Sequence, residues 1–323
     1  MKRIITWILS LLFCATTLMA QDYTLSNHNV VPFSLNPASA GSANTLRLGV
    51  NYRMQWPMLG NNYHTVRVSY DQNVYKQMCS VGASYSYDQH SNIFGTHEFD
   101  AVYAHTFRCA DKHFIRMGLQ GSFFLNQLQM DHLTFGDQYD PSNGSILSNS
   151  AEQFENQSKT FFDFSVGISY VFQDKLMLGF AVYHLAEPDN GFTPNSQFLP
   201  RKYVGQINFV QDLKLNHGLK SQGFSDNYFF ANAFYQQQAD FKQAYIGAGI
   251  CYQPAIVGVS YKTDLDQIHT LSFTLGGYYK GFQLYYVFDL FTSDRKNGSW
   301  SNEISLIYTM PTKVKCLCPV TYW

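Results

Sequence analysis

The chain has 323 residues with 22 basic and 23 acidic side chains, so no basic excess points to nucleic acid. Charged residues make up only 14 % of the sequence, against roughly 25 % in soluble domains. Aromatic residues make up 17 %, and a soluble globule of this composition would tend to aggregate. The composition is typical of a β-barrel whose outer face meets lipid, with aromatic side chains at the membrane interfaces.

The first twenty residues have the pattern of a secretory signal peptide. Lys2 and Arg3 give a positive start, residues 4–12 form a short apolar run, and Ala20 precedes the expected cleavage point at Gln21. The apolar run is too short to span a bilayer. Cleavage would leave a chain of 303 residues, enough for one large β-domain.

Residues two apart share their character along most of the remaining chain. Between residues 45 and 56, one face carries Leu46, Leu48, Val50, Tyr52, Met54 and Trp56, and the other carries Arg47, Gly49, Asn51, Arg53 and Gln55. The same alternation recurs in 161–172 and 282–290. It predicts strands with lipid on one side and a hydrophilic lumen on the other.

Fourteen segments show this alternation, and many have the 9–11 residues that a tilted strand needs to cross a bilayer. They are 45–56, 63–73, 79–88, 95–107, 113–127, 160–172, 175–185, 201–214, 226–237, 242–252, 255–262, 268–279, 282–290 and 300–309. An even number closes an antiparallel barrel with both termini in the periplasm. The sequence thus predicts an all-β transmembrane antiparallel β-barrel of the outer-membrane type. Its expected divisions are a signal peptide over 1–20, the barrel over 21–310 and a periplasmic tail over 311–323.

The lengths of the connections fit this topology. Connections after even-numbered strands should be short periplasmic turns. Three of these connections are tight, namely 173–174, 253–254 and 280–281, whereas 215–225 is a long exception. Connections after odd-numbered strands should be longer and outside the cell, and 128–159 and 186–200 are the longest. Trp56 and Trp300 fall at the outer rim, where interfacial anchors are expected.

Five cysteines follow the leader: Cys79, Cys109, Cys251, Cys316 and Cys318. The predicted strands place all of them at the periplasmic end, where thiols can be oxidised. One hairpin could bring Cys79 and Cys109 together, so a disulfide between them is one possibility. Cys316 and Cys318 have no second ligand cluster nearby, which favours free or mixed-disulfide tail cysteines over a metal site.

No catalytic motif stands out in the sequence. It lacks a nucleophile elbow, a metalloprotease helix, a phosphate-binding loop and a dinucleotide fingerprint. His132 and His184 lie near polar loops without the serine and acid spacing of a triad. The long loop carries four acidic residues, which fit a solvated surface better than a weak cation site: Asp137, Asp140, Glu152 and Glu155. We therefore expect no enzymatic activity, cofactor or metal.

Short motifs follow one another along the chain. Residues 33–42 read FSLNPASAGS, 52–57 read YRMQWP, 135–138 read FGDQ, 183–189 read YHLAEPD, 199–203 read LPRKY, 287–290 read VFDL, 298–304 read GSWSNEI and 318–319 read CP. Their order and spacing resemble the PorP/SprF family of type IX secretion system outer-membrane proteins over essentially the whole mature chain. Glu187 and Asp189 stand where that family usually has Gln and Asn.

The same motifs also have structural interpretations. The dipeptides at 36–37 and 40–41 are turn residues that would position the first strand. Arg53 and Gln55 are expected to fill the lumen through buried hydrogen bonds. Residues 188–189 would form a rigid loop after the seventh strand.

The resemblance implies a non-catalytic role in export. Such a barrel would support secretion or surface anchoring of an adhesin or effector, as in gliding motility, by binding its C-terminal domain. Loops on rigid scaffolds often carry recognition, and the candidate partner-binding residues are Asp137, Gln138, His184, Glu187, Pro188, Asp189, Arg53 and Gln55. The expected partners are outer-membrane lipid, a secreted protein with a C-terminal sorting domain and other type IX components.

Two other functions are open at this point. A diffusion channel or small-solute transporter would use the lumen, although large side chains such as Arg47, Arg53 and Gln55 would narrow it. A barrel lipase or acyltransferase is disfavoured by the missing nucleophile.

Overall fold

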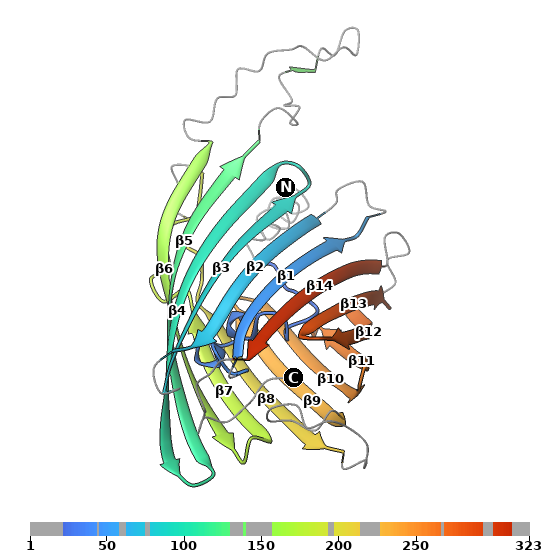
Figure 1. The fold of residues 1–323 in the computed structure, drawn as a ribbon. Coiled ribbons are helices and arrows are strands. Elements are labelled where there is room, and N and C mark those ends of the chain that lie inside the picture. Colours follow the sequence, from blue (N-terminus) through green and yellow to red (C-terminus); the bar gives the residue numbers. More distant parts are fainter. Residues whose placement is uncertain are drawn as a thin grey trace, which may run out of the picture.

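A single closed antiparallel β-barrel accounts for most of the described chain (Figure 1). The computed structural model describes residues 22–43, 45–57, 63–74, 78–129, 138–139, 157–192, 197–213, 227–265, 268–292 and 300–311. Consecutive strands pair with each other, and β1 pairs with β14 from Thr45 opposite Pro311 to Gln55 opposite Ser301. This last pairing closes the sheet, so the predicted fold class is confirmed.

Fourteen strands form the wall. They are β1 Thr45–Gln55, β2 Tyr63–Asn73, β3 Cys79–His90, β4 Phe94–Ala110, β5 His113–Leu128, β6 Ser158–Phe172, β7 Leu176–Tyr183, β8 Lys202–Asp212, β9 Asn227–Gln238, β10 Phe241–Tyr252, β11 Ala255–Thr263, β12 His269–Tyr279, β13 Phe282–Phe291 and β14 Trp300–Pro311. Each overlaps one predicted segment. β4, β5 and β6 have 17, 16 and 15 residues, so the wall is taller on their side (Figure 1).

The two rims of the barrel differ in their connections. At the rim that we call the turn rim, β6 and β7 are joined through Gln173 and Asp174, both with φ near +56°. Positive φ at both residues is the geometry of a type I′ hairpin turn. β1 begins and β14 ends at this rim. The opposite rim, called the loop rim, carries the connections 129–157 and 184–201, although 91–93 and 239–240 are short there.

The alternation of the strands separates an apolar outside from a polar inside. Leu48 and Val50 of β1 are 43 % and 45 % exposed on the outer face. Asn51, the next residue after Val50, points inward and is fully buried. The same holds for β6, where Phe162 and Phe164 point out and Asp163 is buried. The lumen therefore holds many buried ionisable side chains: Arg47, Arg53, Arg67, Asp71, Asp100, Arg116, Asp163, Lys262, Asp289 and Glu303.

Residues 22–43 lie inside the barrel, and we call them the plug; Figure 1 draws them in dark blue behind β1 and β2. The plug contains two single-turn 3₁₀ helices, η1 Pro32–Ser34 and η2 Pro37–Ser39. Three of its apolar side chains, Val30, Val31 and Phe33, are 0–1 % exposed. No helix in the described residues is long and apolar enough to cross a membrane.

The turn residues predicted at 36–37 and 40–41 are present, but they do more than position β1. The Asn36 side chain accepts a hydrogen bond from the Ala38 backbone N–H at 2.9 Å and so starts η2. Gly41 has a φ of +67°, which favours glycine. Both turns belong to the plug and therefore shape the segment that lies in the lumen.

The possible disulfide between Cys79 and Cys109 is wrong. Cys79 of β3 pairs with His105 of β4, so Cys109 lies four residues further along that strand. Both cysteines are free thiols. The tail cysteines Cys316 and Cys318 lie outside the described residues.

An arginine on the outer face tests whether that face meets lipid. Leu119 lies in the middle of β5 and is 60 % exposed. Leu119→Arg is expected to lower the free energy of unfolding in lipid vesicles by about 2–4 kcal/mol, because a charge near the bilayer midplane is poorly solvated. Tyr279→Arg, at the end of β12, is the control and should cost only about 0–1 kcal/mol. Equal costs at both sites would contradict this placement.

Candidate functional site

The plug rests against glycine residues of the wall, where no side chain takes up space. η2 contacts β4, β5 and β6. A β-carbon at Gly118 of β5 would overlap the Pro37 carbonyl carbon and the Ala38 nitrogen, and one at Gly167 of β6 would overlap the Asn36 side chain. Asn36 Nδ2 also donates to the Ile168 carbonyl at 3.0 Å. These wall glycines therefore leave the space in which η2 lies.

Long polar side chains of the wall bind the backbone of the plug between residues 29 and 43. The Arg47 guanidinium donates to the carbonyls of Asn29 and Val30, the latter at 2.7 Å. Arg116 donates to the Ala40 carbonyl. The Asp71 carboxylate accepts the Gly41 N–H at 2.8 Å. Buried peptide groups of this irregular segment thus find partners that a sheet or helix would otherwise supply.

A second group of wall residues binds the plug nearer the loop rim. We call it the Glu303 cluster, and it comprises Arg53, Lys262, Asp289 and Glu303. The two oxygens of Glu303 accept the backbone N–H groups of Ser26 and Asn27 at 2.6 and 2.8 Å. Arg53 bridges Glu303 at 3.0 Å and Asp289 at 2.8 Å, and these side chains are at most 2 % exposed. Loss of one partner from such a buried network leaves an unpaired charge, which costs about 3–5 kcal/mol.

The plug begins at Asp22, which is held at the loop rim by two cationic side chains. Its carboxylate lies 2.9 Å from His184 Nε2 and also forms an ion pair with Lys202. His184 Nδ1 lies 2.7 Å from the Asp163 carboxylate. Burial opposes charge on His184, but Asp22 and Asp163 outweigh it and raise its pKa to about 9. The imidazolium is therefore the stable form at neutral pH.

Tyr23 joins the plug to a third polar group on β2, β3 and β4. Its hydroxyl donates to Glu98 at 3.1 Å and accepts from Arg67 at 2.7 Å. Arg67 in turn forms an ion pair with Asp100 at 2.7 Å. The plug thus contacts the wall on several sides of the lumen.

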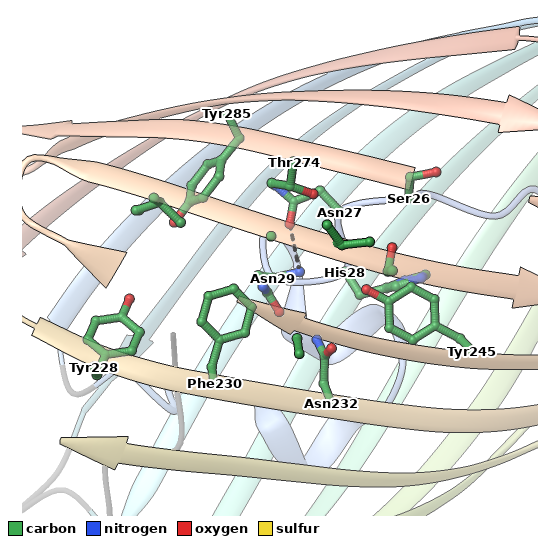
Figure 2. Close-up of a pocket in the computed structure, with 15 residues that line it drawn as sticks. Ser26, Asn27, His28, Asn29, Tyr228, Phe230, Asn232, Tyr245, Thr274 and Tyr285 are labelled. Carbon is green, nitrogen blue, oxygen red and sulfur yellow. Dashed lines mark hydrogen bonds between the residues drawn. The ribbon is translucent and has the colours of Figure 1, made fainter. Parts of the chain in front are cut away.

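A narrow cavity remains between the plug and strands β9 to β13 (Figure 2). Asn27 and His28 line it from the plug, while aromatic rings such as Phe230 and Tyr245 line it from the wall. The buried atoms Asn27 Nδ2 and His28 Nε2 have no hydrogen-bond partner among the described residues. Buried polar atoms need hydrogen bonds, so this polar cavity is suited to water.

Two of the residues predicted to bind a partner contact the plug in this structure. Arg53 belongs to the Glu303 cluster, and His184 holds Asp22. Gln55 is half-buried at the end of β1. The lumen role expected of Arg53 is confirmed.

The loop-rim connection after β7 brings three other predicted residues together in a small hairpin. Asp189 accepts the N–H groups of Gly191 and Gln197, both at 3.1 Å, and forms an ion pair with Lys159 at 3.0 Å. The Pro188 carbonyl accepts the Leu199 N–H at 2.9 Å. Glu187 forms an exposed ion pair with Arg201 at 3.2 Å. The loop expected after the seventh strand is present, and these contacts hold its described residues together.

The remaining predicted positions lie in the long connection after β5. Gln138 is half-buried and has interactions of its own. Asp137, His132, Asp140, Glu152 and Glu155 lie outside the described residues. Among the residues that the structure does describe, no group of three His, Cys, Asp or Glu side chains could hold a metal ion.

Sequence reasoning missed several residues that join the plug to the wall, including Asp22 of the plug and Lys202 and Lys262 of the wall. Their signal was a charged residue at an inward position of an alternating strand. For Asp22, the only hint was its place in the 24 residues between the leader and β1, which do not alternate.

An added methyl group at Gly118 tests the seating of the plug. Gly118→Ala is expected to lower the free energy of unfolding by about 1–3 kcal/mol, because η2 must move or the strand must bend. It should also expose residues 22–43 to added protease. The control is Gly205→Ala in β8, where no atom lies within 4 Å of the new carbon, and it should change stability by less than about 1 kcal/mol. Equal effects of the two variants would rule out this seat.

The pH dependence of stability tests the charge on His184. Its pKa of about 9 in the folded protein exceeds the ordinary value of 6.5. The stabilisation is therefore complete below about pH 6.5 and is lost as the pH rises through about 9. Between these values, the unfolding free energy of the wild type should fall by about 1–3 kcal/mol more than that of His184→Gln. Parallel pH profiles in denaturant titrations would contradict a charged His184.

Comparison with known protein families identifies one that this sequence matches. The sequence matches the family described as "Type IX secretion system membrane protein PorP/SprF" over residues 17–308. No curated protein matches the chain.

Several solved barrels resemble the structure with low sequence identity. The CymD monoaromatic hydrocarbon channel has a TM-score of 0.49 at 10 % identity, covering 88 % of this chain and 94 % of its own. The Pseudomonas putida toluene transporter TodX has a TM-score of 0.46 at 9 % identity, covering 91 % and 96 %. Omp33 of Acinetobacter baumannii has a TM-score of 0.45 at 8 % identity, covering 83 % and 100 %.

The family match covers nearly the whole barrel together with its plug, and it ends within the last strand. This chain belongs to the PorP/SprF family of type IX secretion system membrane proteins.

Proposed function

We propose that this barrel supports export and surface anchoring of a secreted adhesin or effector by binding that protein's C-terminal domain. Family membership places the chain in the type IX secretion system. In this role the barrel is a non-enzymatic binding platform in the outer membrane, working with other type IX components.

The filled lumen is the observation that favours binding over passage of solutes. The plug contacts β1 through Arg47 and β5 through Arg116, and across the lumen it contacts β10 through the ring of Tyr245 against His28. It therefore crosses the interior rather than lining one side. A diffusion channel needs a continuous water-filled path, and a segment lying across the lumen works against one. Binding of a protein needs a rigid scaffold with accessible loops, and the barrel supplies both.

The orientation follows from the lengths of the connections. We propose that the turn rim faces the periplasm and the loop rim faces outward, after removal of a leader over 1–20. In this orientation β14 ends at the periplasmic rim, while the described chain starts at Asp22 in the outer half of the lumen. The partner would meet the loops around 128–159 and 184–201, with Asp137, Gln138, Glu187, Pro188 and Asp189 as candidate contacts.

Co-purification tests the role. The affinity-tagged barrel, extracted from native membranes in mild detergent, is expected to carry with it the secreted protein encoded beside it. Deletion of the C-terminal domain of that secreted protein should abolish co-purification, because the binding segment is lost. A deletion of equal length elsewhere in the same protein serves as the control. Retention of the partner without its C-terminal domain would refute the proposed binding mode.

A further inference from the structure

The plug has two parts that are held by different forces. Residues 29–43, called the anchor, are held by buried apolar side chains, by the close fit of η2 against Gly118 and by the polar wall side chains that bind their backbone. Residues 22–28, called the strap, are held mainly by polar side chains near the loop rim. The anchor is joined to the strap by hydrogen bonds from the Asn29 and Val30 N–H groups to Asn27, at 3.3 and 3.4 Å. The other contacts of the anchor are with the wall, so they can remain when the strap leaves.

The wall around the strap binds both the backbone and one hydroxyl. Ser26 Oγ donates to Asp289 at 2.5 Å and accepts from Lys262 at 2.6 Å. Glu303 accepts two successive backbone N–H groups, those of Ser26 and Asn27. Such contacts do not depend on the side chains of the bound segment. Because Arg53, itself paired with Asp289, holds Glu303 in place, the carboxylate is ready to bind without rearrangement.

The other end of this site recognises a carboxylate. His184 and Lys202 both contact Asp22, and Lys202 also lies 4.7 Å from the centre of the Tyr183 ring. Asp163 faces His184 from β6, so the imidazolium keeps one acidic partner if Asp22 leaves. Among the described residues, Lys202 forms its ion pair with Asp22. If the strap leaves, the Lys202 ammonium group therefore needs a new anion.

This end of the site is also accessible. The side chains of Asp22 and Lys202 are 21 % and 14 % exposed, whereas those of the Glu303 cluster are almost fully buried. Ion pairs that water can reach exchange more readily than buried ones. A competing peptide would therefore meet the Asp22 end first, from the loop rim.

We propose that the strap is the resting occupant of a peptide-binding site formed by His184, Lys202 and the Glu303 cluster. An extended segment of the exported partner that carries a carboxylate replaces the strap when the partner binds. This inference rests on the proposed function and adds to it the place and chemistry of recognition.

Peptide binding tests the site without the partner. The probe is a fluorescent, N-acetylated peptide with the sequence DYTLSNH of residues 22–28, titrated with the full-length barrel in detergent micelles. The wild-type strap competes at high effective concentration because it is tethered. Asp22→Asn weakens this competitor, so it should bind the probe at least about fivefold more tightly than the wild type does. A probe that begins with Asn instead of Asp should lose that gain.

Matched variants separate the site from general charge effects. Lys202→Gln should bind both probes weakly, because the carboxylate loses its cation. Lys175→Gln removes the same charge from an exposed lysine at the turn rim and should match the wild type. Ser26→Pro removes a strap N–H that Glu303 accepts and should also increase probe binding, which covers the case that Asp22→Asn fails to fold. Two results would overturn the site. One is that the Asp and Asn probes bind equally well to Asp22→Asn and Ser26→Pro. The other is that these variants bind the Asp probe no more tightly than the wild type does.

Competition with the partner separates this inference from the proposed function. The C-terminal domain of the co-purifying secreted protein should bind Asp22→Asn more tightly than wild type, and excess DYTLSNH peptide should displace it. Equal binding to wild type, Asp22→Asn and Lys202→Gln without displacement would overturn the inference and leave the proposed function intact. No binding to wild type or to Asp22→Asn would overturn both.

Discussion

The structure depends on the pairing of charges inside the barrel. Arg47, Arg53 and Arg116 point into the lumen and are at most 2 % exposed. A guanidinium cannot lose its charge, so each must find acceptors when water is excluded. The wall supplies Asp289 and Glu303 to Arg53, but Arg47 and Arg116 find backbone carbonyls of the plug. The plug is thus a part of the folded interior and not an appended segment.

This constraint links the fold to the role of the family. A barrel of fourteen strands encloses more space than its own inward side chains fill, and the plug occupies that space. The result is a rigid cylinder with the tallest wall at β4 to β6 and with its longest connections at one rim. Such a body suits a protein that holds another protein at the membrane, which is the role proposed here for this PorP/SprF member.

The strands could be predicted because alternation is local. Predicted segment 45–56 corresponds to β1 Thr45–Gln55, and the errors fall at ends where a local conformation decides. Predicted segment 175–185 ran past Tyr183 because His184 adopts a φ of +59°, which alternation does not reveal. The plug could not be placed, since its position depends on contacts such as that of Ser26 with Glu303, far apart in sequence. The inward position of Glu303 was predictable, but its partner was not.

Ion conductance across a planar bilayer tests the plugged lumen most directly. Wild-type barrels inserted at a known density are expected to show no steady ohmic conductance, and removal of residues 22–43 is expected to open one. A steady, voltage-independent conductance of the wild type, comparable to that of an open barrel, would contradict the account, because the plug could not then fill the interior.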